Sequence, residues 1–270
     1  MTRTADSPAP SSLAGRLPWL LAVLVVAWSP RLVPGSFATD DLAFMNVEPD
    51  PGTMLQQGRP GQALLYAVFR ALGAHPVHAG SLLNWVAIGL LALTSLGLLR
   101  VWRVTPTLLS VLCISLAFVH PNLAETFTFR FTPVFFAVAM ALAIGGLVLA
   151  HEGAPIRGGL LVLVSLTVYQ ITLNTLLTVL ALGVVLDCLR GSTGGAALRG
   201  WWRPAAVVGV AAALYLVLQR LAAAALGSSV QGGRARFISL EAVPDRLRAL
   251  GPVFRRVLGD DPVLSTGGLR

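Results

Sequence analysis

The chain has 270 residues, of which 55% are hydrophobic and only 12% are charged, whereas soluble domains usually carry about 25% charged residues. This composition excludes a soluble enzyme, a disordered chain and a disulfide scaffold, and it predicts a multi-pass membrane protein. Twenty arginines against twelve acidic residues give a net charge of +8. The arginines are scattered between apolar runs, so no nucleic-acid partner is expected.

The N-terminal part predicts a polar tail, a first span and an acidic loop. Residues 1–16 are polar and are expected to form a disordered cytoplasmic tail, and an apolar run covers 17–35. A signal peptide is an alternative interpretation of this run. We favour a retained span, because prolines and Arg31 separate its apolar core from the small residues that would form a cleavage site. The first external loop is then 36–60.

Four further segments follow in chain order. Residues 61–74 have helical spacing but are too short to span, so this segment is expected to lie at the interface or to re-enter the membrane. Spans are expected over 81–99, 105–119 and 131–150.

The largely apolar run 158–189 is too long for one upright span. As a single helix it would reach about 48 Å, against a hydrocarbon core of about 30 Å. We expect it to break near Tyr169-Gln170…Asn174 into two short helices, and one tilted helix is the alternative. A last span is expected over 204–226. The arginine-rich tail 227–270 is expected to contact lipid headgroups. An alternative interpretation is a truncated continuation of the helical bundle.

The expected fold is an all-α transmembrane bundle of about six to eight spanning or re-entrant helices over 17–226. Positively charged loops stay in the cytoplasm. This rule puts the N-terminus inside and both 36–60 and 120–130 outside. If the run 158–189 breaks into two helices, the segments expected in the cytoplasm are Arg100 to Arg103, 151–157 and 190–203. With one tilted helix, 190–203 would be outside and the tail inside.

Two acidic residues follow the first span. A carboxylate at the middle of the bilayer costs about 2.5–3.5 kcal/mol on insertion scales, so Asp40 and Asp41 are expected at the interface or in a wet cavity. They have two interpretations. They cap the helix that begins after them, or one of them is a general base at the membrane surface.

Other polar residues fall at the expected external ends. Arg59 either extends its side chain to the interface or binds a phosphate. Arg130 has the same two interpretations, and pairing with Glu125 is a third. His120 either ends its span or contacts phosphate or sugar.

Polar groups also occur inside an apolar run. Tyr169, Gln170 and Asn174 are expected to face the bundle interior, either as helix–helix contacts or as part of the same external cavity. His75 and His78 form an H-x-x-H, but no carboxylate or cysteine is near them in sequence. We therefore predict no metal site there.

Four motifs occur in a fixed order: Asp40-Asp41, Gly58-Arg59-Pro60, Pro121-Asn122…Glu125 and Tyr169-Gln170…Asn174. Their order and their expected side resemble the GT-C superfamily of membrane glycosyltransferases, and most of all the O-antigen glucosyltransferase (Gtr) family. Together they cover about residues 17–190. Chains of that family generally continue into further helices.

The resemblance implies transfer of a glucose-like hexose on the external face, from a polyprenyl-phosphate-linked donor to a cell-envelope glycan or lipid-linked acceptor. It makes Asp40 or Asp41 the general base. The residues that it implies for substrate binding are Arg59, His120, Asn122, Glu125, Arg130, Tyr169 and Gln170. No cofactor is expected, and assistance by a divalent metal stays open. The alternatives are a transporter or flippase component for lipid-linked sugars and a non-catalytic truncated membrane protein.

Overall fold

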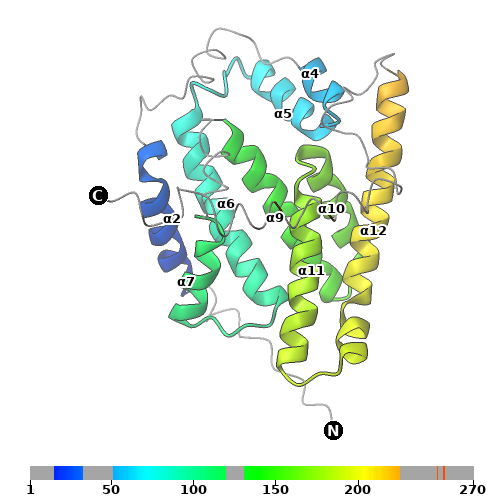
Figure 1. Cartoon of the computed structure of the whole chain (residues 1–270). Helices are drawn as coiled ribbons and strands as arrows, with labels where there is room; N and C mark the ends of the chain where they lie inside the picture. Colours follow the sequence, from blue (N-terminus) through cyan, green and yellow to red (C-terminus); the bar gives the residue numbers. More distant parts are fainter. Residues whose placement is uncertain (1–14, 33–50, 120–130, 226–247, 249–251, 253–270) are drawn as a thin grey trace. The chain divides into compact units, whose positions relative to one another are not determined.

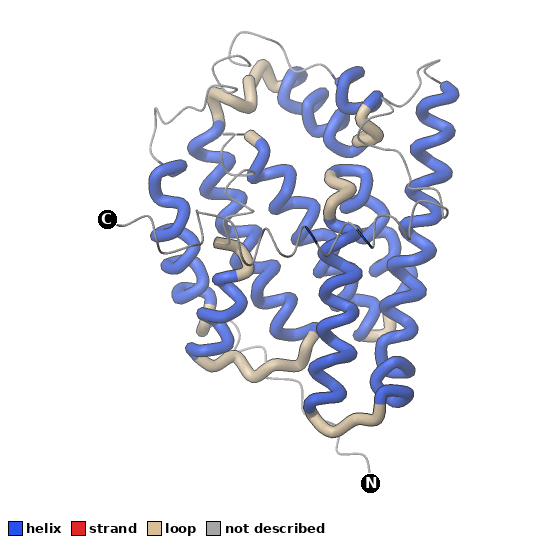
Figure 2. The backbone as a smooth tube through the Cα atoms, viewed as in Figure 1, coloured by secondary structure: helices blue, strands red, loops and turns tan. Residues whose placement is uncertain are grey.

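The computed structural model describes residues 15–32, 51–119 and 131–225, together with Arg248 and Pro252. Within these ranges the chain forms helices and no strands (Figure 2). The helices are α2 (Leu17–Leu32), α4 (Pro51–Gln56), α5 (Pro60–Ala71), α6 (Gly80–Val101), α7 (Leu108–Leu116), α9 (Thr132–His151), α10 (Pro155–Val168), α11 (Thr172–Leu189) and α12 (Gly194–Ala225). All of them belong to one compact unit, residues 1–230, and residues 231–270 form a second unit.

Four of the described helices, α6, α9, α11 and α12, are long and apolar enough to cross a membrane. Helices α2 and α10 are apolar but shorter, with 16 and 14 residues. Large apolar side chains face outward on many helices, among them Val26, Leu189 and Val210. Apolar exposure on this scale is unusual for a protein in water and is expected where helices face lipid. The chain is therefore an all-α membrane bundle, as its composition predicts.

Helix α9 lies at the centre of the bundle, between α6 and α10 (Figure 1). Two thirds of its apolar stretch is buried, the largest share among the four candidate spans. Glycines let it approach α10 closely: a Cβ atom on Gly146 would collide with the carbonyl oxygen of Gly158, and the reverse also holds. Small residues at such contacts are typical of helix packing in membranes, where association depends on close van der Waals contact.

Replacing Gly146 by valine is expected to destabilise the bundle by about 1–3 kcal/mol, because the neighbouring backbone cannot move away from the added carbons. The matched control is Gly145→Val, whose Cβ would meet only Leu161, at 3.8 Å. Thermal unfolding in detergent measures the difference. Equal melting temperatures for the two variants would contradict the close contact between α9 and α10.

The predicted break in 158–189 is confirmed. Helix α10 ends at Val168 and α11 begins at Thr172, with Tyr169 in an extended conformation (φ −152°, ψ 104°). The Thr172 hydroxyl donates to the Tyr169 carbonyl at 2.8 Å, and the Ser165 hydroxyl donates to the Ala139 carbonyl of α9 at 2.7 Å. Bonds of this kind satisfy polar groups where a helix is interrupted at membrane depth.

The predicted span 105–119 is wrong in extent. Helix α7 has only nine residues, about 13.5 Å at 1.5 Å per residue, which is less than half of the hydrocarbon core. Thr107 caps its start by accepting from the Ser110 N–H at 3.2 Å. Beyond its end, the Phe118 carbonyl accepts a hydrogen bond from the Trp28 indole of α2 at 3.1 Å. The carbonyl is thus bonded to a neighbouring helix.

The last span starts ten residues earlier than predicted, at Gly194, and Pro204 lies inside α12. A proline inside a helix removes one backbone hydrogen bond. The early turns of α12 are held from outside the helix: the Trp201 indole donates to a carboxylate oxygen of Asp187 at 2.8 Å.

Several arginine-bearing segments that are far apart in sequence meet at one end of the bundle. Arg16 donates to the Pro106 carbonyl at 2.9 Å, which joins the start of α2 to the loop after α6. Arg100 and Glu152 form an ion pair of 2.6 Å between the ends of α6 and α9. The topology derived from charge requires these segments to lie on one side, and their contacts agree with it.

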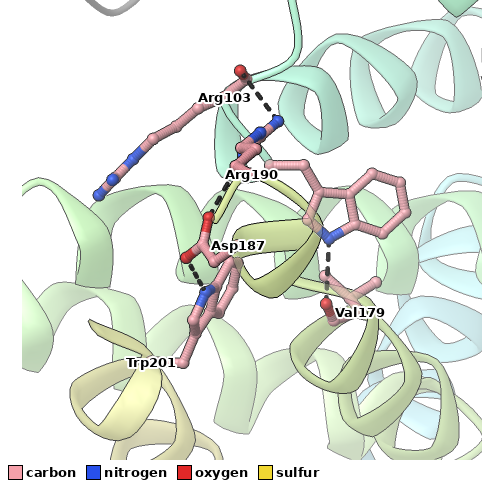
Figure 3. Close-up of polar contacts among 6 residues, drawn as sticks. Arg103, Val179, Asp187, Arg190 and Trp201 are labelled. Atoms are coloured by element: carbon pink, nitrogen blue, oxygen red, sulfur yellow. Dashed lines mark hydrogen bonds and ion pairs between the residues drawn. The ribbon is translucent and has the colours of Figure 1, made fainter. Parts of the chain in front are cut away.

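The same end holds a second set of contacts around Asp187 (Figure 3). Besides Trp201, Asp187 pairs with Arg190 at 3.3 Å, and Arg190 donates in turn to the Arg103 carbonyl at 3.3 Å. The Trp102 indole donates to the Val179 carbonyl at 3.0 Å. These bonds fasten the end of α6 to the middle and the end of α11, and the end of α11 to the early turns of α12. We call this end of the bundle the arginine-bearing end.

Candidate active site

Arg59 lies between α4 and α5, at the end of the bundle opposite the arginine-bearing end (Figure 1). Its guanidinium carbon is 4.9 Å from the centre of the Tyr169 ring, a cation–π distance. Its Nε donates to the Gln170 side-chain oxygen at 3.5 Å, and a terminal nitrogen donates to the Gln62 side-chain oxygen at 3.4 Å. Both bonds are long and therefore weak. In the described part of the chain they engage two of the five guanidinium N–H donors.

The loop that carries Arg59 is held in place through the backbone of Gly58. The Gly58 carbonyl accepts from the Tyr215 hydroxyl at 2.6 Å and from the Gln170 side-chain nitrogen at 2.9 Å. That nitrogen also lies 3.0 Å from the Gln57 carbonyl and 2.7 Å from the Tyr215 hydroxyl. Gly58 has φ +74°, and a Cβ there would collide with the Gln219 amide. Arg59 is thus positioned by the α10–α11 break and by α12.

Polar contacts continue from Arg59 along the inner face of α5. Gln62 and Tyr66 are both buried there. The Tyr66 ring packs against Phe135 of α9, with ring centres 5.2 Å apart. Burial raises the pKa of the Tyr66 phenol, and its hydrogen bond to Gln62 and the charge of Arg59 offset this only in part. Tyr66 therefore keeps its proton at neutral pH. We call Arg59, Gln62, Tyr169, Gln170 and Tyr215 the Arg59 cluster.

The outer face of α5 is apolar and exposed. Leu64, Val68 and Leu72 follow one another at intervals of four residues and lie on one side of the helix. With 12 residues, α5 is too short to span, as predicted for 61–74. An apolar outer stripe over a polar inner face is typical of a helix that lies at a membrane interface.

Helix lengths give the depth of the Arg59 cluster. Helix α10 begins beside the arginine-bearing end, and its 14 residues carry the chain about 21 Å to the break at Tyr169. From Arg203 to Tyr215 along α12 the rise is about 18 Å. From the same break, the 18 residues of α11 return about 27 Å toward the arginine-bearing end, close to a hydrocarbon core of about 30 Å. These lengths put the Arg59 cluster close to the opposite membrane interface, where α5 lies, and a cation held in such a polar cluster is a candidate for function.

The structure brings together three of the residues predicted for the site: Arg59, Tyr169 and Gln170. Asn174 lies exposed on the first turn of α11, and among the described residues no contact joins it to these three. The remaining predicted site residues lie outside the described residues: Asp40, Asp41, His120, Asn122, Glu125 and Arg130.

Sequence reasoning missed three residues around Arg59: Gln62, Tyr215 and Gln219. Tyr215 and Gln219 are buried polar residues within the last apolar helix. Polar groups inside an apolar run drew attention to Tyr169 and Gln170. The same signal was present on α12 and would have indicated Tyr215.

We find no group of three or more His, Cys, Asp or Glu side chains that could hold a metal ion among the described residues. His75 and His78 pack edge to face, with ring centres 5.2 Å apart. The Arg59 cluster is cationic and amide-rich, so the ligand that it suits is an anion, such as a phosphate.

Tyr215→Phe is expected to lower the free energy of unfolding by about 1 kcal/mol, because it removes a buried hydroxyl that bonds the Gly58 carbonyl. The control is Thr178→Val, since the Thr178 hydroxyl donates only to the Asn174 carbonyl of its own helix, at 2.9 Å, and is exposed. Melting temperatures in detergent measure both. A Tyr215→Phe variant as stable as wild type would contradict the role assigned to this hydroxyl.

Comparison with known proteins identifies the family. The family model described as Glucosyl transferase GtrII matches residues 32–251, about four fifths of the chain. The matched range includes every residue of the Arg59 cluster. No curated protein and no solved structure matches the chain. Because the match covers far more than half of the sequence, the chain belongs to the GtrII glucosyl transferase family and is a membrane glucosyltransferase.

Proposed function

We propose that this glucosyltransferase takes glucose from a polyprenyl-phosphate-linked donor and transfers it to a cell-envelope glycan or lipid-linked acceptor on the external face. The Arg59 cluster is the single observation that carries the proposal. It holds a cation close to the membrane interface, where a phosphate attached to a membrane lipid can reach it. The cluster lies opposite the arginine-bearing end, which the charge rule assigns to the cytoplasm.

The proposed step is a single displacement at the anomeric carbon. The carboxylate of Asp40 or Asp41 takes the proton of the acceptor hydroxyl as its oxygen attacks that carbon. The bond from the anomeric carbon to the phosphate oxygen breaks, and polyprenyl phosphate leaves with the bonding electrons. Positive charge develops on the sugar in the transition state, and a nearby carboxylate stabilises it.

Arg59 is proposed to bind the departing phosphate. A guanidinium stays charged at all working pH values and offers paired donors that match phosphate oxygens. Tyr169 covers one face of the guanidinium, and Gln170 accepts a weak hydrogen bond from its Nε. The positions proposed to complete the substrate site are His120, Asn122, Glu125 and Arg130.

Reconstitution tests the proposal directly. Purified protein in liposomes is given polyprenyl-phosphate glucose, carrying radiolabelled glucose, and a lipid-linked glycan acceptor. We expect labelled glycan and free polyprenyl phosphate in equal amounts. Movement of the labelled lipid between leaflets without any labelled glycan would instead indicate a transporter, and no change in the lipid at all would contradict both activities.

Cysteine labelling tests the proposed orientation. Cys113 and Cys188 are first replaced by alanine, and single cysteines are placed at Ser36, Gln57 or Ser192. We expect a membrane-impermeant thiol reagent to label the first two on intact cells, and to label Ser192→Cys only after permeabilisation. Labelling of Ser192→Cys on intact cells would place the arginine-bearing end outside and reverse the proposed topology.

A further inference from the structure

We propose that the groove between α10 and α12 binds the hydrocarbon chain of the lipid-linked donor. This inference rests on the proposed function and adds the place where the lipid lies. The groove has a volume of about 360 Å³. Its lining is entirely apolar and includes Pro155, Gly159 and Leu163 of α10 and Ala206, Val210 and Leu214 of α12.

Small side chains make the hollow. Gly159 contributes no side chain, and a Cβ there would lie 3.8 Å from Val207, so space remains between the two helices. Ala206 faces the same space from α12. Ile156 and Val210 on its rim are 80% and 61% exposed. The groove therefore opens on the surface that faces lipid.

The groove leads to the Arg59 cluster. On α12, its last lining residue is Leu214, and the next residue is Tyr215, whose hydroxyl holds the Gly58 carbonyl. On α10, Leu163 lies one turn before Thr167, against which Gly61 at the start of α5 packs. The groove thus begins near the arginine-bearing end and stops at Leu163 and Leu214, beside the residues of α10 and α12 that contact the loop carrying Arg59.

The α10–α12 groove and the Arg59 cluster together select the ligand. A single apolar groove that ends beside a cation-bearing cluster matches a single hydrocarbon chain that ends in a phosphate. The groove extends about 12 Å along each helix, from Pro155 to Leu163 and from Ala206 to Leu214. A glycerophospholipid has two chains, whereas a polyprenyl phosphate has one chain that ends directly in its phosphate.

Filling the groove tests the inference. Ala206→Leu and Gly159→Leu each put a large side chain into it. Their matched controls are Ala205→Leu and Gly209→Leu, because Ala205 and Gly209 are exposed and do not line the groove. Glucosyl transfer is measured with a long polyprenyl-phosphate glucose and with a short donor of two isoprene units. We expect the groove variants to raise KM for the long donor at least tenfold and to leave KM for the short donor and the melting temperature unchanged.

A crosslinking experiment separates the failure of this inference from that of the proposed function. Polyprenyl phosphate with a diazirine in its chain is irradiated with the protein. We expect labelled peptides from α10 and α12, with labelling competed by polyprenyl phosphate and not by phosphatidylglycerol. Equal competition by phosphatidylglycerol would overturn the inference, because it indicates a general lipid contact. Unchanged KM in the groove variants of an active enzyme would also overturn it. Specific labelling of a protein without transfer would contradict the proposed function alone.

Discussion

Asp40→Asn and Asp41→Asn are expected to give the largest losses of activity, with the essential one of the two lowering kcat by about 10²–10⁴-fold. Asparagine has nearly the same shape as aspartate but cannot accept the acceptor's proton, and it cannot stabilise positive charge on the sugar. Membrane insertion and expression should stay at wild-type levels, since the change is isosteric. The measurement is glucosyl transfer in liposomes, normalised to the amount of inserted protein.

Glu152→Gln is the matched control for these two variants. Glu152 pairs with Arg100 at the arginine-bearing end, with 41% of its side chain exposed. Exposed pairs of this kind contribute little to stability, so transfer should be unchanged. If both aspartate variants kept wild-type transfer, the assignment of a carboxylate base to this loop would be wrong, and Asp40 and Asp41 would be helix caps.

The sequence was sufficient to predict the helical class and the break in 158–189. Both follow from local physical limits: a 32-residue apolar run exceeds the thickness of the bilayer, and polar residues such as Tyr169 and Gln170 mark where it is interrupted. The spans that were wrong in extent, α7 and α12, were set by contacts from other helices. Trp28 bonds the Phe118 carbonyl, and Asp187 bonds Trp201.

The assembly around Arg59 could be predicted only in part. Its central bond joins Tyr215 to Gly58, which are 157 residues apart. No local pattern gives the register of α12 against α4, so no spacing rule could pair these residues. The sequence alone could identify a short set of polar residues in apolar surroundings, and Tyr215 belonged to that set.

The two polar groups at opposite ends of the bundle differ in what they can bind. Asp187 has both carboxylate oxygens engaged, one by Trp201 at 2.8 Å and one by Arg190 at 3.3 Å (Figure 3). Both oxygens of that group are engaged in joining helix ends. Among the described residues, Arg59 donates only long bonds, of 3.4 and 3.5 Å, to neutral amide oxygens. A phosphate would form shorter, charge-assisted bonds and could displace them.

Arg59→Gln is therefore expected to lower transfer by about 10²–10³-fold, the loss typical of removing a donor that stabilises charge in the transition state. The loss should fall mainly on kcat, because negative charge increases on the phosphate oxygen as the bond to glucose breaks. Arg59→Lys keeps the charge but loses the planar, paired donors, so its activity should lie between those of wild type and Arg59→Gln.

The control for Arg59 is Arg157→Gln, an exposed arginine at the start of α10, on the arginine-bearing end. It changes the net charge by the same amount and should leave kcat and KM unchanged. Equal losses for Arg157→Gln and Arg59→Gln would mean that transfer responds to the overall charge of the protein. If Arg59→Gln kept the wild-type kcat, the Arg59 side chain would only extend to the membrane interface and would not contact the leaving phosphate. A loss confined to Arg59→Gln, with partial recovery in Arg59→Lys, identifies a local contact with the leaving phosphate.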